Sequence, residues 1–328
     1  MTFTSRGLYA SSSKVPRRRR PRVGWLVLGA IVAVAALVLG ALVALADVSL
    51  DREEKAASFS GVSGLVVRNQ TVGDIRLTGT EGDAVTVERT SRGSPLAEPV
   101  ESLTENGDEL RAEARCEGPA LFVFGSCRVD YVIGVPEGTS ISVETGSGAV
   151  DAVSLDADLK VSSASGTVEV DGMRGDVTAS TSWGEIELEG VEGSIDLETR
   201  SGGIEASGSG DSARAVSTSG SVDLDDFSAT TVEASSTSGG VELGGGFETA
   251  DVSSTSGHVA IETAGPFQRI TAESTSGGVD IEVPAGTYDV SAETGSGGRD
   301  IGVGTSPDAS ARIEARTTSG SLSIQPED

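Results

Sequence analysis

The stretches VTASTSWGEIEL (residues 177–188) and VEASSTSGGVEL (residues 232–243) contain the pattern that decides the fold. In each, two short runs alternate apolar and polar residues and are joined by a turn that contains glycine. Alternation with a period of two is typical of β-strands that bury one face. This glycine recurs ten times, at intervals of 18 residues at first and of 18 to 23 later: Gly148, Gly166, Gly184, Gly202, Gly220, Gly239, Gly257, Gly277, Gly297 and Gly320.

The near-constant period predicts that these units coil and stack. Apolar residues stand seven and five positions before each glycine and four positions after it, so stacked units would bury them in columns, as Val232, Ala234 and Leu243 illustrate. We therefore predict an all-β protein, a β-solenoid of about ten rungs of 18–20 residues. A long antiparallel meander or a β-sandwich is the alternative, although neither needs so constant a period.

Hydroxyl residues occupy a further inward position, three before each glycine. There we expect Ser or Thr side chains to form hydrogen bonds with each other or with the backbone of neighbouring rungs near the turn. All ten positions fit: Thr145, Ser163, Thr181, Thr199, Ser217, Ser236, Ser254, Ser274, Thr294 and Thr317.

The chain before the regular repeats carries the same alternation in a weaker form. We predict irregular N-terminal β rungs over residues 61–138, interrupted by a polar loop at 91–107, and regular β-solenoid repeats over 139–328. Residues 47–60 are expected to form a short charged stalk.

An uncharged stretch of 24 residues, 23–46, precedes this stalk. As a helix it would be about 36 Å long, enough to cross a hydrocarbon core of about 30 Å, so we predict one transmembrane helix. Basic residues in the tail 1–22 place the N-terminus in the cytoplasm and the β-solenoid outside, where it would be a single-pass cell-membrane protein. The tail is also expected to bind anionic inner-leaflet lipid through Arg17, Arg18, Arg19, Arg20 and Arg22.

A cleaved signal peptide is the alternative reading of the same stretch. Ala44-Leu45-Ala46 has the small-x-small form of a cleavage site, and cleavage after Ala46 would release a secreted protein. The apolar run is longer than the usual apolar region of a signal peptide, which favours the uncleaved anchor.

The charge is divided sharply between the two parts of the chain. The net charge is −26, yet residues 1–46 contain no acidic residue, and residues 47–328 carry 50 acidic and 17 basic residues. A surface this negative repels phosphate, so we expect no nucleic-acid binding. Cations and basic partners are favoured.

The only two cysteines, Cys116 and Cys127, lie close together in the sequence. Outside the cytoplasm they are expected to form a disulfide, with two buried free thiols as the alternative.

An acidic residue stands three positions after most of the glycines. Stacked rungs would bring these side chains into one acidic stripe, which either is a solvated face or binds divalent cations or a basic partner. The stripe is the candidate metal site: Asp151, Glu169, Glu187, Glu205, Asp223, Glu242, Asp280 and Asp300.

Little in the sequence indicates catalysis. The single histidine, His258, falls at an outward turn position, and no pair of carboxylates stands out from the many surface acids. We therefore predict that the protein is not an enzyme, has no catalytic residues and uses no cofactor, apart from the divalent cation considered for the stripe.

The runs STSGSVDL (217–224), STSGGVEL (236–243) and STSGGVDI (274–281) carry a resemblance to a known family. The region 65–324 resembles the bacterial putative-adhesin family of unknown function, whose members have β-strand repeats and are related to head GIN domains. VPEGTSISVETGSG (135–148) also recurs as VPAGTYDVSAETGSG (283–297). The resemblance implies the fold and no site residues.

Two functions fit these observations. The first is a non-enzymatic, adhesin-like interaction or envelope scaffold module that presents the β-solenoid to an extracellular protein or glycan. The alternative is an envelope-stress sensor that signals through the basic cytoplasmic tail.

Overall fold

The computed structural model describes residues 23–46, 51–93, 97–118 and 127–327, which form two separate units. The first unit contains one helix, α1 (Val23–Ala46). Among the residues described, no helix meets the length and hydropathy needed to cross a membrane. The basic tail, with Arg17, Arg18, Arg19, Arg20 and Arg22, lies outside the described residues.

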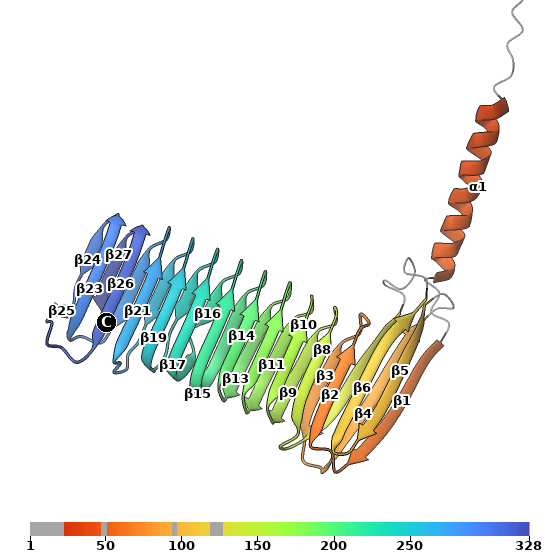
Figure 1. Cartoon of the computed structure of the whole chain (residues 1–328), viewed down its shortest axis with the longest axis horizontal. Helices are drawn as coiled ribbons and strands as arrows, with labels where there is room; N and C mark the ends of the chain where they lie inside the picture. Colours follow the sequence, from red (N-terminus) through yellow and green to blue (C-terminus); the bar gives the residue numbers. More distant parts are fainter. Residues whose placement is uncertain (1–22, 47–50, 94–96, 119–126, 328) are drawn as a thin grey trace, which may run out of the picture. The chain divides into compact units, whose positions relative to one another are not determined.

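The second unit is a β-solenoid of about ten turns, as predicted, and its strands form two stacks (Figure 1). Nearly all neighbouring strands pair in parallel, which excludes the antiparallel meander and the β-sandwich. The first stack runs in this order: β5 (Glu98–Asn106), β6 (Glu109–Glu117), β2 (Gly64–Asn69), β8 (Ser140–Thr145), β10 (Leu159–Ser163), β12 (Val177–Thr181), β14 (Ile195–Thr199), the second half of β15 (Ile204–Ser217), β17 (Phe227–Ser236), β19 (Phe247–Ser254), β21 (Arg269–Ser274), β26 (Arg312–Ser319) and β23 (Thr287–Ser296).

The second stack lies across the core from the first. Its order is β1 (Asp51–Ser60), β4 (Ala84–Gly93), β7 (Arg128–Pro136), β3 (Ile75–Thr80), β9 (Val150–Asp156), β11 (Val168–Arg174), β13 (Ile186–Glu192), the first half of β15, β16 (Val222–Leu224), β18 (Val241–Leu243), β20 (Val259–Glu262), β22 (Val279–Val283), β27 (Leu322–Pro326) and β24 (Arg299–Ile301). The short strand β25 (Gly304–Thr305) pairs with the start of β23.

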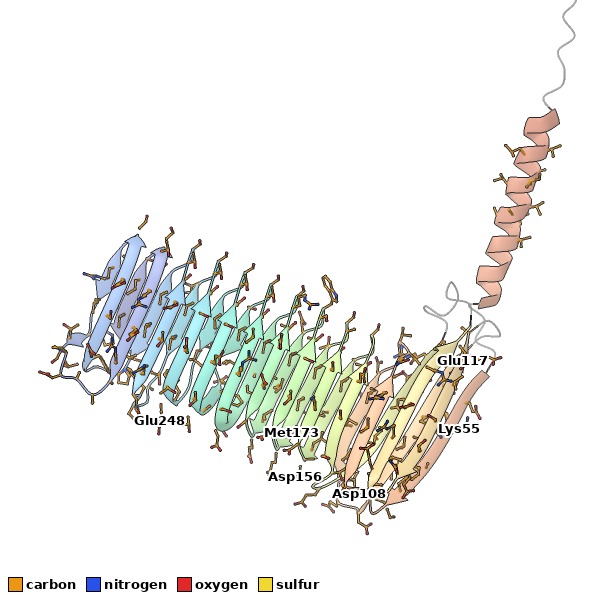
Figure 2. The ribbon with its side chains drawn as sticks, viewed as in Figure 1. Lys55, Asp108, Glu117, Asp156, Met173 and Glu248 are labelled. Atoms are coloured by element: carbon orange, nitrogen blue, oxygen red, sulfur yellow. A yellow bond between two sulfur atoms is a disulfide. The ribbon has the colours of Figure 1, made fainter. Side chains whose placement is uncertain are left out.

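The predicted apolar columns form the core. Val232, Ala234 and Leu243 are each at most 1% exposed, and their equivalents in adjacent rungs are in register with them. A further buried column lies at the second corner of the rungs, where Met173 (Figure 2) is in register with Leu155 and Val191. Towards the C-terminal end aromatic rings fill this corner, and the rings of Phe267 and Tyr288 stack with centroids 5.3 Å apart.

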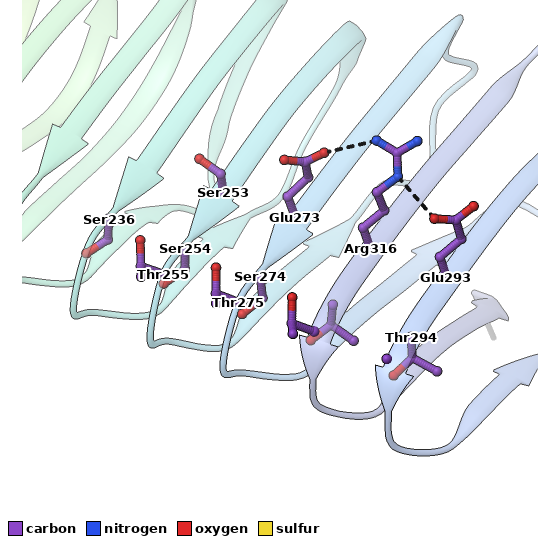
Figure 3. A pocket seen from close by; sticks show the side chains of 13 residues that line it. Ser236, Ser253, Ser254, Thr255, Glu273, Ser274, Thr275, Glu293, Thr294 and Arg316 are labelled. Carbon is purple, nitrogen blue, oxygen red and sulfur yellow. Dashed lines mark hydrogen bonds and ion pairs between the residues drawn. The ribbon is translucent and has the colours of Figure 1, made fainter.

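The hydroxyl column connects adjacent rungs through their backbones. Ser254 Oγ accepts a hydrogen bond from the N–H of Gly257 at 2.8 Å and donates one to the carbonyl oxygen of Gly239 in the preceding rung at 2.9 Å. Ser274 repeats both bonds one rung further on, and Figure 3 shows Ser236, Ser254 and Ser274 on successive rungs. The prediction that these hydroxyls are structural is confirmed at these positions.

The N-terminal region differs from the prediction. Residues 51–60, predicted as part of a stalk, form β1, which pairs antiparallel with β4. The expected polar loop at 91–107 contains the end of β4 and the whole of β5, with residues 94–96 outside the described part. Both segments pair antiparallel at the end of a stack, where a strand satisfies its backbone hydrogen bonds while polar side chains stay exposed, which explains why strands form here.

The order of the rungs in space differs from their order in the sequence at both ends. The rung of β2 and β3 lies between the rung of β6 and β7 and the rung of β8 and β9. At the other end, β26 and β27 lie between β21 and β22 on one side and β23 and β24 on the other (Figure 1). The last repeat in the sequence is therefore an internal rung.

Candidate functional site

The acidic stripe is continuous over only part of the β-solenoid. Glu169, Glu187, Glu205, Asp223 and Glu242 stand in register on consecutive rungs. Asp151 extends the row by one rung, but its carboxylate pairs with Arg76 at 2.9 Å.

The two remaining residues of the predicted stripe are separated from this row. Ala260 interrupts it after Glu242, and the rung that carries Ser323 lies between Asp280 and Asp300. The sequence order placed Asp280 and Asp300 side by side. This expectation was wrong because β27 is inserted between β22 and β24.

A second row of carboxylates, which the sequence analysis missed, runs beside the first. Asp171, Glu189 and Asp225 stand five positions after the repeat glycine, and this is the next outward position of the alternating strand. The recurrence of acids at this second position was the signal that could have revealed the row. Together the two rows make a two-dimensional acidic surface instead of a single stripe.

The two rows line a surface groove of about 560 Å³. Within the described residues, none of its carboxylates forms an ion pair. The eight that line the groove are Glu169, Asp171, Glu187, Glu189, Glu205, Asp223, Asp225 and Asp226. We call this surface the acidic groove. At about 5 Å, two like charges repel by nearly 1 kcal/mol even in water, so a basic ligand would relieve an existing repulsion.

At one end of the acidic groove, two of its carboxylates lie close to that of Glu242 on the next rung. Oxygen atoms of Asp223, Asp225 and Glu242 lie within 4.8 Å of one another. Burial, followed by the negative charges of Asp223 and Glu242, raises the pKa of Asp225 above its ordinary value. Carboxylate oxygens are ligands for hard divalent cations, and the predicted cation at this surface stays a prediction.

The raised pKa of Asp225 makes a testable prediction about stability. The folded chain holds this proton more tightly than the unfolded chain, so the contribution of Asp225 to stability falls as the pH rises above 3.8 through the folded pKa. Asp225→Asn is therefore expected to stabilise the β-solenoid at neutral pH, by less than about 1 kcal/mol because solvent screens the charges. Urea unfolding at pH 7 and at pH 3 measures the effect.

The control for this variant is Asp83→Asn, which also removes one negative charge, but at a position outside the groove. The stabilisation by Asp225→Asn should disappear at pH 3 and shrink in high salt, whereas Asp83→Asn should have little effect. Equal effects of both variants at pH 7 would contradict a local repulsion in the groove.

Arginines flanked by acids on both sides occur elsewhere on the β-solenoid. Arg316 lies between Glu273 and Glu293, with distances of 3.5 and 3.7 Å (Figure 3). Arg68 lies in the same way between Glu113 and Glu144. In these two places an arginine neutralises the acids on both sides of it. The carboxylates of the acidic groove have no such arginine between them.

The remaining predicted residues are placed as follows. Cys116 and Cys127 form a disulfide, and residues 119–126 between them lie outside the described part. His258 is about half exposed, and its Nε2 lies 3.2 Å from the carboxylate of Asp280 on the neighbouring rung. It is a surface turn residue, as expected.

Comparison with known proteins extends over nearly the whole second unit. The sequence profile of the Toastrack DUF4097 family matches residues 62–325. No curated protein matches the chain.

Two solved structures cover most of the chain at low identity. One, called a putative adhesin from Parabacteroides merdae, aligns over 85% of this chain and 97% of its own at 12% identity, with a TM-score of 0.44. Another, called a putative lipid binding protein from Parabacteroides distasonis, aligns over 85% of this chain and 98% of its own at 14% identity, with a TM-score of 0.45.

Proposed function

Since the chain belongs to the Toastrack DUF4097 family, we propose that it is a non-enzymatic, adhesin-like interaction module that binds a basic protein partner through the acidic groove. The observation that carries the proposal is the set of eight groove carboxylates without an ion-pair partner among the described residues. Parallel strands above and below each internal rung hold these side chains on a rigid surface.

Electrostatics explains why a basic protein segment fits this surface. Adjacent rungs are about 4.8 Å apart, so the carboxylates are closely spaced, and the long, flexible Lys or Arg side chains of a basic segment can reach them. Complementary charge speeds association and favours the correct partner over anionic ones. The excess of acidic residues over residues 47–328 adds a long-range attraction for the same partner.

The binding test uses the full chain in lipid nanodiscs and a fluorescent decalysine peptide. We expect the triple variant Glu187→Gln, Glu205→Gln, Asp223→Asn to weaken binding at least tenfold in 0.15 M salt. The control variant, Glu81→Gln, Asp83→Asn, Glu137→Gln, removes the same charge from exposed sites outside the groove. Equal weakening by both triple variants would mean that overall charge, and not the groove, binds the peptide.

We further propose that α1 anchors the protein in the cell membrane with the β-solenoid outside the cytoplasm. Support comes from the 24 uncharged residues of Val23–Ala46, the arginines before them and the acids after them. The chain is expected to stay in the membrane fraction after alkaline carbonate extraction, while protease added to intact cells removes the β-solenoid. Recovery of a soluble chain that begins at Asp47 would contradict the anchor.

A further inference from the structure

One edge of the β-solenoid departs from the repeat at three positions in two adjacent rungs. The residue directly before the repeat glycine is serine in nine of the ten rungs, and Trp183 is the exception. Two positions before the glycine, Arg200 is the only charged residue among the ten. Four positions before it, Glu198 is, among the described residues, the only glutamate that forms no close ion pair. Glu144, Glu273 and Glu293 each pair with an arginine, whereas Glu198 acts on Arg214 only through a longer-range attraction.

The rungs place these three residues together. β12 and β14 pair in parallel with Thr181 opposite Thr199, and the N–H of Arg200 donates to the carbonyl oxygen of Thr181 at 3.3 Å. Since adjacent rungs lie about 4.8 Å apart, Arg200 stands beside the Ser182-Trp183 turn of the preceding rung.

A polar groove of about 310 Å³ occupies this edge. Its lining includes Ser162, Ser180, Ser182, Glu198, Arg200 and Thr218. Trp183 directly follows Ser182 in the same turn, and its side chain is exposed. The groove thus combines hydroxyls, one carboxylate and one guanidinium, and the turn next to it carries an exposed aromatic residue.

None of the three residues is explained by packing or by internal bonding. The Trp183 side chain is 68% exposed, and Glu198 and Arg200 are exposed. Within the part of the chain that the structure describes, the side chains of Glu198 and Arg200 form no ion pair or hydrogen bond. Serine suffices in the same turn of the other rungs, so the fold does not require an indole here.

We propose that Trp183, Glu198 and Arg200 form a binding site for a neutral glycan. An exposed indole offers a flat apolar face on which the C–H face of a sugar ring can stack. The carboxylate accepts and the guanidinium donates paired hydrogen bonds, which suits vicinal sugar hydroxyls. Serine and threonine hydroxyls along the groove add further partners for sugar oxygens.

The charges favour a neutral ligand over the charged alternatives. Glu198 and the surrounding acidic surface disfavour a polyanion, and the guanidinium of Arg200 disfavours a polycation at this edge. A basic segment has a stronger attraction at the acidic groove, where the eight carboxylates have no neighbouring arginine in the groove lining. The glycan site is therefore independent of the proposed protein-binding site.

The experiment uses the full chain with Trp25→Phe in lipid nanodiscs, so that Trp183 is the only tryptophan and no sugar-based detergent competes. The probes are neutral hexasaccharides of glucose, N-acetylglucosamine, mannose and galactose. At least one is expected to change the Trp183 fluorescence saturably, with a Kd on the order of 0.1 to 1 mM. Calorimetry follows binding in variants that lack the fluorophore.

Three variants replace each residue with the type found at the same position in other rungs, and so test binding without disturbing the fold. Trp183→Ser should abolish binding of that hexasaccharide, and Glu198→Ser and Arg200→Thr should each weaken it about tenfold, with unchanged urea unfolding. Decalysine binding should be unaffected by all three.

Two outcomes would overturn the proposal. One is the lack of a saturable response to any of the four hexasaccharides. The other is equal hexasaccharide affinity of Trp183→Ser and the parent chain. Failure of decalysine binding would count against the acidic groove alone.

Discussion

Replacing Gly202 with alanine is expected to destabilise the β-solenoid by about 3 to 5 kcal/mol, among the largest effects of any single substitution. A Cβ atom at this position would lie 1.8 Å from the carbonyl oxygen of Gly184 and 2.6 Å from its carbonyl carbon. Both atoms belong to the backbone of the preceding rung, which the ladder hydrogen bonds hold in place. The rungs would have to separate locally to admit the methyl group.

The neighbouring glycine provides a matched control. A Cβ atom on Gly203 would meet nothing closer than Ser221, whose carbonyl oxygen lies 3.9 Å away. Gly203→Ala should therefore change the free energy of unfolding by no more than about 0.5 kcal/mol. Urea unfolding of the full chain, followed by far-ultraviolet circular dichroism, compares the two variants. Equal stability would show that the rungs are not in close contact at this turn.

Ending the chain after Ala311 is expected to release two rungs, although it removes only one repeat. The missing strands β26 and β27 are the parallel partners of β23 and β24. Their buried residues Ile313, Leu322 and Ile324 cover the rungs on both sides. Loss of this burial costs about 5 kcal/mol or more locally, so residues 287–301 should lose their protection from hydrogen exchange.

A second truncation tests the order of the rungs directly. A chain that ends after Pro284 lacks both terminal rungs, and it should unfold at nearly the same urea concentration as the chain that ends after Ala311. In a β-solenoid stacked in sequence order, the longer chain would keep β23 and β24 folded on β21 and β22. Protection of residues 287–301 in that chain would contradict the inserted rung.

Charge complementarity gives a physical reason for the inserted rungs. In sequence order, Glu273 would face Glu293 across the rung interface, and like charges facing each other on adjacent strands are destabilising. Insertion of β26 places Arg316 between the two carboxylates (Figure 3). Arg68 does the same between Glu113 and Glu144 at the other end.

The connections that pass over the inserted rungs share a sequence. V-P-x-G-T occurs at 135–139, between β7 and β8, and at 283–287, between β22 and β23. Each of these connections passes one rung, that of β2 and β3 in the first case and that of β26 and β27 in the second. The recurrence was visible in the sequence, but only the structure relates it to a skipped rung.

Arg299 also departs from the repeat for a reason that only the structure shows. It stands where other rungs have a buried Val, Ile or Leu, and the structure places it in the outermost rung at the C-terminal end. There it is exposed, and its guanidinium donates to the carbonyl oxygen of Ala292 across the open end of the core. A charged residue at an inward position of an edge rung discourages end-to-end association, which explains the departure.

The sequence by itself determined which side chains face inward, where each rung turns and that acids line one face. These properties depend on the alternation and on the recurring glycine, both of which act within a single rung. The structure alone decided which rungs are neighbours, that Asp280 and Asp300 are separated, and that Glu198 and Arg200 line one groove beside the turn of Trp183. Near-identical repeats can stack on one another in several orders, so neighbours are chosen by ion pairs, ring contacts and connections between residues far apart in the chain.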